Sequence, residues 1–221
     1  MAVVPPRGQV EDVRSANRAL LLAISRDMRV VSCPTLAERS GLSRATAYGI
    51  AEELQRAGVL VEAGTGKSTG GRRPQLLRFE PQAWFALGVE LGERDLHAVV
   101  TDLDGTVLQR EFSVAQGTTP AQVVEAIAAS VARLVALLPR RRALGIGFAA
   151  PGLVDVDTGV VRTAVGYDWR DVPLADLLRA HTGLPASLAN RSKAAALGEL
   201  YSGAGTGAQR LIYLYAGRGI A

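Results

Sequence analysis

Cysteine and histidine are scarce in this 221-residue chain, which has one cysteine, Cys33, and two histidines, His97 and His181. A single cysteine cannot build a disulfide framework, so a reducing compartment is the simplest expectation. These three side chains also cannot supply the His and Cys cluster that a structural metal needs. We therefore predict no metal site and no cofactor within this chain.

Long apolar runs are lacking as well. No apolar stretch reaches the length of about 20 residues that a membrane-spanning helix requires, and residues 1–9 carry no signal-peptide core. The content of 48% hydrophobic and 21% charged residues is typical of a soluble globular protein. We expect a cytoplasmic protein without a membrane partner, with room for a small and a medium domain.

Positive charge is concentrated in the first third of the chain. Residues 1–78 hold 12 Lys and Arg against 7 Asp and Glu, a net charge of +5, whereas residues 79–221 hold 13 against 14 and carry −1. This asymmetry indicates that the first region, and not the whole surface, meets a polyanion such as the DNA backbone.

Residues 34–79 have the pattern of a winged helix-turn-helix. Thr35 is expected to cap a first helix, with Glu38 completing a capping box three residues later. Gly41 ends that helix, and Ser43 caps a second helix over residues 44–57. Residues 59–63 and 75–79 are expected to pair as two strands around a tip at residues 64–74.

The second helix and the tip carry the residues expected to touch double-stranded DNA. The tip combines four glycines with three cations and no acid, so its backbone can approach a groove closely. The alternatives are an ordinary three-helix packing and a solvated cationic loop, but the two patterns in tandem favour DNA binding. The candidate DNA contacts are Ser43, Arg44, Thr46 and Tyr48 on the helix, and Lys67, Arg72 and Arg73 in the tip.

The second region, residues 81–221, reads as an α/β domain. The alternation of apolar and polar residues predicts three strands at residues 85–91, 96–102 and 106–114, joined by tight turns. Thr119 and Pro120 open a long helix with a broad apolar face. Further strands are expected at 143–149, 160–162, 185–189 and 211–215, with helices at 173–181 and from 190 onward.

Three stretches of this region resemble the ROK family of repressors and sugar kinases: Gly145–Asp155, Thr158–Val161 and Asn190–Glu199. The resemblance implies an actin-like (ribonuclease H-like) ATPase-type α/β lobe. Members of the repressor branch have a winged helix-turn-helix in front of it. We therefore expect a mixed α+β and α/β chain, with a winged helix-turn-helix domain at 1–80 and a partial lobe at 81–221 that is incomplete at its C-terminus.

Three departures from the family pattern argue against sugar kinase activity. Family kinases carry an Asp-x-Gly-Gly-Thr phosphate turn where this chain has residues 90–94, Glu-Leu-Gly-Glu-Arg. The Asn-Asp pair, whose Asp is the general base, is replaced by Asn190-Arg191, and a guanidinium cannot accept a proton. The Gly-Thr-Gly phosphate turn appears as residues 217–219, Gly-Arg-Gly. No residue is therefore assigned a catalytic role.

Sugar binding is a separate expectation from the resemblance. Family sugar sites use the Pro-Gly turn and the Asn of the Asn-Asp pair, so Gly152, Asn190 and the adjacent Arg191 are the candidate sugar-binding residues. The alternatives are that Gly152 only forms a turn, Asn190 only caps a helix and Arg191 is solvated. The family's Glu-x-Gly-His stretch and its cysteine-rich zinc loop would lie beyond Ala221, so the chain is expected to be a fragment or a truncated product.

These observations predict a sugar-responsive regulator that represses carbohydrate-utilisation genes and is not an enzyme. Its partners would be a double-stranded DNA operator and a monosaccharide or sugar-derivative effector, and it would be a homodimer because such repressors read paired half-sites. The alternatives are a ROK-type sugar kinase with an accessory DNA-binding domain and a regulator that binds no effector.

Overall fold

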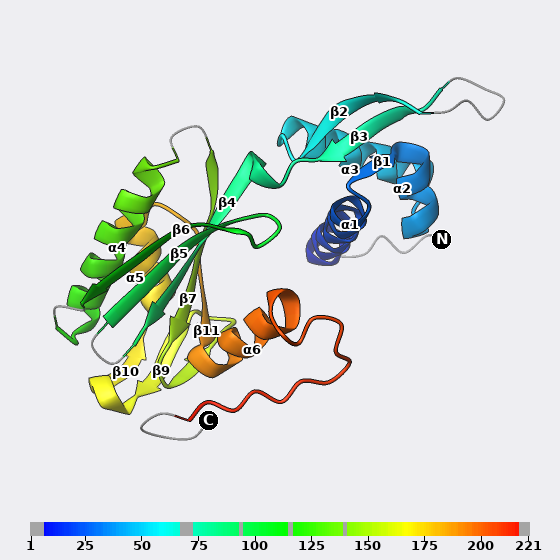
Figure 1. Cartoon of the computed structure of the whole chain (residues 1–221). Coiled ribbons are helices and arrows are strands. Elements are labelled where there is room, and N and C mark those ends of the chain that lie inside the picture. The colour runs from blue at the N-terminus through cyan, green and yellow to red at the C-terminus, as the bar shows by residue number, and fades with distance from the viewer. Residues whose placement is uncertain (1–6, 67–72, 93–94, 115–116, 139–140, 217–221) are drawn as a thin grey trace. The chain divides into compact units, whose positions relative to one another are not determined.

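The computed structural model describes residues 7–66, 73–92, 95–114, 117–138 and 141–216, with only the backbone described for residues 7–12 (Figure 1). The chain forms two compact units, Met1–Ala83 and Trp84–Ala221. The division into independent domains after residue 80 stays a prediction. None of the helices in the described ranges is long and apolar enough to cross a membrane.

The first unit packs helices against a small antiparallel sheet. The helices are α1 (Arg7–Met28), α2 (Cys33–Ser40) and α3 (Arg44–Arg56). The strands are β1 (Val30–Ser32), β2 (Leu60–Thr65) and β3 (Gln75–Phe79), in the sheet order β1-β3-β2, and a short 3-10 turn, η1 (Pro81–Ala83), follows them. The buried side chains of α3 are Ala47, Ile50, Ala51 and Leu54.

One predicted helix start in this unit is wrong. Ser32, and not Thr35, caps α2: its hydroxyl accepts a hydrogen bond from the Thr35 backbone N–H at 3.3 Å. The helix therefore starts at Cys33, and Glu38 lies too far along for a capping box. Pro34 fits in the first turn because backbone N–H groups there have no partner within the helix. The predicted end at Gly41, with a φ of 69°, and the predicted cap at Ser43 are confirmed.

The second unit is built around a five-stranded mixed sheet of order β11-β7-β4-β5-β6. Its strands are β4 (Trp84–Leu91), β5 (Asp95–Asp102), β6 (Val107–Val114), β7 (Arg142–Ala150) and β11 (Ala186–Asn190). Strand β7 lies parallel to both β4 and β11, whereas the β4–β5 and β5–β6 pairs are antiparallel. A second sheet of order β10-β9-β8 contains β8 (Leu153–Asp155), β9 (Val160–Ala164) and β10 (Trp169–Val172), with η2 (Val165–Tyr167) between the last two.

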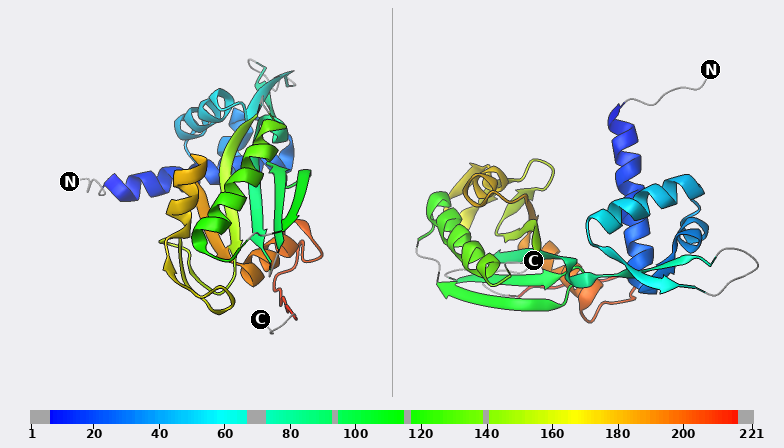
Figure 2. Two further views of the ribbon diagram at one scale, coloured as in Figure 1. Left: turned by 90° about the vertical axis from the view of Figure 1, so that its left-hand side faces the viewer. Right: turned by 90° about the horizontal axis from the view of Figure 1, so that it is seen from above.

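Helices lie on both sides of the five-stranded sheet (Figures 1 and 2). On one side are α4 (Pro120–Ala136) and α5 (Leu174–Thr182), and on the other is α6 (Arg191–Ser202). Helix α4 begins as predicted, with Thr119 as its cap in a capping box with Gln122 and with Pro120 at its first position.

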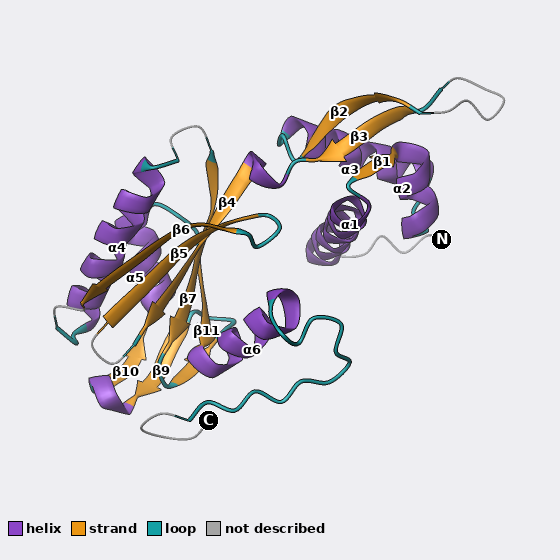
Figure 3. Ribbon diagram, viewed as in Figure 1, coloured by secondary structure: helices purple, strands orange, loops and turns teal. Residues whose placement is uncertain are grey.

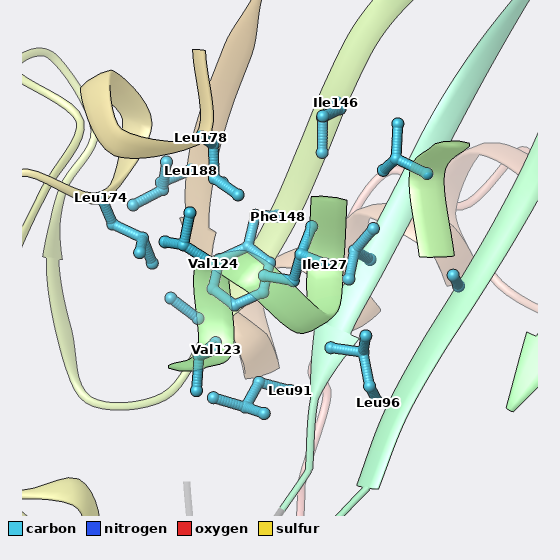
Figure 4. Packing of buried hydrophobic residues seen from close by; sticks show 14 of the residues in the cluster. Leu91, Leu96, Val123, Val124, Ile127, Ile146, Phe148, Leu174, Leu178 and Leu188 are labelled. Atoms are coloured by element: carbon cyan, nitrogen blue, oxygen red, sulfur yellow. The ribbon is translucent and has the colours of Figure 1, made fainter. Parts of the chain in front are cut away.

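The main core lies between the sheet and helices α4 and α5 (Figure 4). Strand β4 alternates between buried side chains that face these helices and partly buried ones on the opposite face. Burying each large aliphatic or aromatic side chain contributes about 1.5–3 kcal/mol, so this layer dominates the stability of the unit. The labelled core residues in the figure are Leu91, Leu96, Val123, Val124, Ile127, Ile146, Phe148, Leu174, Leu178 and Leu188.

The strand predicted at residues 211–215 is absent: this segment is a loop that follows α6 (Figure 3). Ile212 is 95% exposed and Leu214 is 70% exposed, so the apolar side chains that suggested a strand are not buried. A strand forms only where its backbone groups pair with a neighbour. None of the described strands supplies that partner here.

Candidate functional site

The exposed side of α3 in the first unit carries the first group of predicted site residues. Ser43, Arg44, Thr46 and Tyr48 are all exposed. The Ser43 hydroxyl accepts a hydrogen bond from the Thr46 backbone N–H at 3.1 Å, and the two hydroxyl oxygens lie 2.9 Å apart. Ser43 and Thr46 therefore build the start of the helix, whereas Arg44 and Tyr48 point away from the core and are available to a partner.

The β2–β3 hairpin carries the second group. Arg73 is exposed just before β3, and the Gly66 backbone N–H donates to the Pro74 carbonyl at 2.8 Å where the strands end. Lys67 and Arg72 lie outside the described residues. Together with α3, this hairpin accounts for all the predicted DNA contacts of the chain.

In the second unit, Gly152 and Asn190 are brought together because their strands are parallel neighbours. Asn190 is opposite Ala150 in the β11–β7 pair, so both residues lie where the two strands end. The Asn190 Nδ2 donates to the Gly152 carbonyl at 2.8 Å. Its Oδ1 accepts from the backbone N–H groups of Ser192 at 3.0 Å and Lys193 at 3.3 Å, which caps α6.

Gly152 is a turn residue with a φ of +79°, a backbone region that side chains other than hydrogen disfavour. A Cβ atom at this position would lie 1.9 Å from the Thr163 carbonyl oxygen. The turn therefore requires glycine for its own geometry. The structure supports the helix-capping interpretation of Asn190 and the turn interpretation of Gly152, and both roles hold the Pro-Gly turn against the start of α6.

Arg191, the first residue of α6, is not a solvated arginine. Its Nε lies 3.9 Å from Oε1 of Glu90 at the end of β4, and its guanidinium carbon is 4.7 Å from the centre of the Tyr215 ring. Its side chain is only 23% exposed. A cation–π contact at such a partly exposed site contributes about 0.5–1 kcal/mol. The contact with Tyr215, 24 positions away, has no signal in the sequence.

A hollow of about 380 Å³ lies between the open face of the sheet and α6. Gly88, Gly147 and Ser187 line its sheet side, and its charged or titratable lining residues are Glu90, His97 and Arg191. His97 is paired with Glu90 across the β4–β5 ladder, where its ring packs edge-on against Phe112 and its Nε2 lies 3.3 Å from Asp95. His97 was not predicted as a site residue, although strand alternation places it on the same face as Glu90.

The β4–β5 turn, where the family resemblance led us to expect the counterpart of the kinases' phosphate turn, is held by contacts within the protein. The Tyr167 hydroxyl donates a hydrogen bond to the Gly92 carbonyl. A Cβ atom built on Gly92 would lie only 1.7 Å from Oδ1 of Asp95, so the Asp95 carboxylate occupies the space that a side chain would need. Residues 93, 94 and 217–219, which carry the other departures from the kinase pattern, lie outside the described residues.

Asp155 closes the hairpin that follows Gly152. The Arg162 guanidinium donates to its carboxylate at 2.6 Å, and the Thr158 backbone N–H donates at 3.2 Å. These hydrogen bonds lower the pKa of Asp155 to about 2, and the bond from Arg162 has the largest effect. Arg162 also bonds to Asp171 at 3.1 Å, so the carboxylates have a structural role. Within the described ranges, no group of three or more His, Cys, Asp and Glu side chains could hold a metal ion.

The mixed α/β fold of the second unit is one that regulators and sugar kinases share. The ROK family profile matches residues 86–221, and the chain belongs to the ROK family. It is 30% identical over 94% of its length to a putative xylose repressor of Caldicellulosiruptor sp. (strain Rt8B.4), of which it covers 53%. The chain thus spans about half the length of the curated relatives it matches.

Two solved structures show the same fold. A ROK family transcriptional regulator, a homologue of the E. coli MLC protein, aligns with 85% of this chain and 48% of its own, with a TM-score of 0.72 and 22% identity. A ROK family glucokinase from Streptomyces griseus, in complex with glucose and AMPPNP, aligns with 62% of this chain and 42% of its own, with a TM-score of 0.56 and 32% identity.

Proposed function

We propose that this chain is a sugar-responsive, DNA-binding transcriptional repressor of carbohydrate-utilisation genes. The observation that carries the proposal is the extent of the matches. Similarity to the putative xylose repressor covers 94% of the chain, whereas similarity to the glucokinase structure covers 62%. The basic first unit supports DNA as the partner. We place the protein in the cytoplasm, where the DNA is, as a homodimer that reads two half-sites.

The first unit is proposed to act as a winged helix-turn-helix. Helices α2 and α3 and the β2–β3 hairpin have the order and spacing that this motif requires. Arg44 and Tyr48 would contact bases or phosphates in the major groove, with Ser43 and Thr46 at the helix start beside the backbone. Arg72 and Arg73 would enter the minor groove, where a narrow A·T tract strengthens the negative potential, and Lys67 would contact phosphate.

The second unit is proposed to bind a monosaccharide or sugar derivative near the contact between Gly152 and Asn190. That contact joins the Pro-Gly turn to α6, and Arg191 next to it connects α6 to Glu90. A ligand that separates or tightens these elements would favour one conformation over another, which is how an effector changes DNA affinity. Arg191 would also favour an anionic sugar derivative, because a guanidinium forms strong charge-assisted bonds to phosphate.

We further propose that the chain is not an enzyme and carries no cofactor of its own. Arg191 stands where family kinases have the general base, and a guanidinium cannot take up a hydroxyl proton. The similarity to the Streptomyces griseus glucokinase is the observation that favours the alternative, a sugar kinase with an accessory DNA-binding domain. ATP consumption that depends on a hexose, above a matched blank, would establish that alternative.

The direct test is an electrophoretic mobility shift assay with the DNA upstream of the protein's own gene, with and without a panel of sugars and sugar phosphates. We expect binding that weakens steeply with salt, because each phosphate contact releases counterions, and a shift that one sugar class changes. Binding that is absent, or insensitive to salt, would overturn the DNA-binding proposal. Binding that no sugar changes would favour a regulator without an effector.

A further inference from the structure

An open hollow of about 310 Å³ lies between helices α1 and α3 of the first unit, beside the exposed side of α3. Its position matters because α3 carries the predicted base-contacting residues Arg44 and Tyr48. Both helices contribute side chains of different chemistry. The lining residues are Val13, Arg14 and Asn17 from α1, and Ala45, Thr46, Gly49, Ile50 and Glu53 from α3.

Gly49 lies in the middle of α3, where glycine is unfavourable compared with alanine because it loses more backbone entropy on folding. It is exposed, and its φ angle is not positive. A Cβ atom built on it would meet no atom of the described residues within 4 Å. Within the described part of this unit, neither the backbone conformation nor the packing therefore requires glycine. Among these residues, none fills the space above Gly49.

Among the described residues at the rim of the hollow, two arginines surround one acidic side chain. Glu53 accepts a hydrogen bond from Arg14, and its Oε2 lies 3.4 Å from Nε of Arg18. The bond from Arg14 is the main reason why the pKa of Glu53 is lowered. Two guanidinium groups thus face one carboxylate, and the side chains of Arg14 and Arg18 are 63% and 49% exposed. Ion pairs whose arginines are this exposed contribute little to stability, so a phosphate can compete with Glu53 for the two arginines.

We propose that this hollow receives the sugar–phosphate backbone of DNA, with Gly49 as the point of closest approach and with Arg14 and Arg18 as phosphate contacts. The inference rests on the proposed function, since it assumes that α3 faces DNA. It adds α1 to the DNA-binding surface. The contact is to the backbone, so it positions the protein on any sequence without reading bases.

The main test is Gly49→Ala in the whole chain, measured by fluorescence anisotropy on two labelled duplexes, one from the promoter of its own gene and one of mixed sequence. We expect the added methyl group to weaken binding to both duplexes by about tenfold, because it displaces the backbone from its contacts. The same change should raise the Tm by about 2–8 °C, since alanine is the better helix former. Opposite signs for affinity and stability exclude simple unfolding as the cause.

Gly198→Ala is the matched control, because Gly198 is also exposed within a helix, α6, and no described atom lies within 4 Å of an added Cβ. It should raise stability and leave DNA affinity unchanged. Unaltered affinity in Gly49→Ala would overturn the inference, and so would a loss confined to the promoter duplex, which would indicate a base contact. If the unsubstituted chain binds neither duplex, the proposed function fails first.

Salt dependence tests the arginines separately. Arg14→Gln and Arg18→Gln should each reduce the slope of log affinity against log salt by about 0.9, the value for one lost phosphate contact. Glu53→Gln should strengthen binding to both duplexes, because it removes the anion that competes with phosphate. Arg26→Gln, on the last turn of α1, is the control and should leave the slope unchanged. Equal slopes in all four variants would contradict the phosphate contacts.

Discussion

The side-chain amide of Asn190 donates a hydrogen bond of 2.8 Å to the backbone carbonyl of Gly152, 38 positions earlier in the chain. The same amide group caps α6 through its oxygen. One side chain therefore holds the turn after β7 against the start of α6, at the place where family resemblance puts the sugar. The first two predictions concern this contact.

Replacement of Asn190 should separate its two roles. Asn190→Ala removes both the cap and the bond to Gly152, and the lost cap alone should lower the free energy of unfolding by about 0.5–2 kcal/mol. Asn190→Ser keeps a capping oxygen but cannot reach Gly152, so its smaller loss measures the bond between the strands. Urea unfolding of both variants provides the comparison. Equal losses of unfolding free energy in the two variants would show that the cap contributes nothing to stability.

Gly152→Ala should be strongly destabilising, by about 2–5 kcal/mol, because it combines a positive φ with a steric clash. The Cβ would lie 1.9 Å from the Thr163 carbonyl oxygen. Gly183→Ala is the matched control, since Gly183 has a similar φ of +68° but no described atom lies within 4 Å of an added Cβ. Thermal unfolding should show the smaller loss for Gly183. A similar loss of stability in both variants would mean that the turn at Gly152 shifts and relieves the clash.

Asp155 should titrate at about pH 2, because Arg162 and Thr158 stabilise its ionised form. The folded-state pKa lies below the usual value near 3.9. The contribution of Asp155 to stability is therefore complete above about pH 4 and is lost as the pH falls towards 2. Carbon-detected NMR should place the midpoint, and Arg162→Met should raise it. Arg179→Met, which removes a different exposed ion pair, should leave the midpoint of Asp155 unchanged.

Arg191 should determine whether an anionic sugar is preferred. We expect this chain to bind a hexose phosphate more tightly than the free hexose, by about tenfold to a hundredfold, since a charge-assisted bond forms only with the phosphate. Calorimetric titration should show that Arg191→Ala abolishes the difference, whereas Lys193→Ala on the same helix leaves it in place. If Arg191→Ala retains the preference, its contacts with Glu90 and Tyr215 are purely structural.

The two predicted DNA-contacting elements should differ in what they read. Arg72→Ala combined with Arg73→Ala should weaken binding most at sites with A·T-rich flanks, because minor-groove arginines sense groove width and potential. Tyr48→Ala should mainly relax the choice of bases within a half-site, since the recognition helix meets base edges. Binding selections on randomised duplexes can measure both. Uniform losses in both variants would indicate phosphate contacts alone.

The sequence correctly predicted the helix ends that depend only on a few adjacent residues. Ser43 and Gly41 delimit a helix start and a helix end, and both act as predicted, because capping and positive φ depend on a few adjacent residues. Alternation placed β4 correctly within one residue. The predicted start of α2 was wrong because two hydroxyl residues, Ser32 and Thr35, can both act as the helix cap. Only the path of the backbone after β1 decides which of them does so.

The sequence alone carried the resemblance to the ROK family, the basic first region and the expectation that Arg191 stands in place of a kinase base. Tertiary structure alone decided what those residues touch. The pairing of Arg191 with Glu90, its stacking on Tyr215 and the hollow beside Gly49 all join segments that are distant in the chain. The segment at 211–215 has the apolar residues of a strand, yet it forms none. Periodicity describes which side chains a strand would bury, whereas hydrogen bonding to a neighbour decides whether it exists.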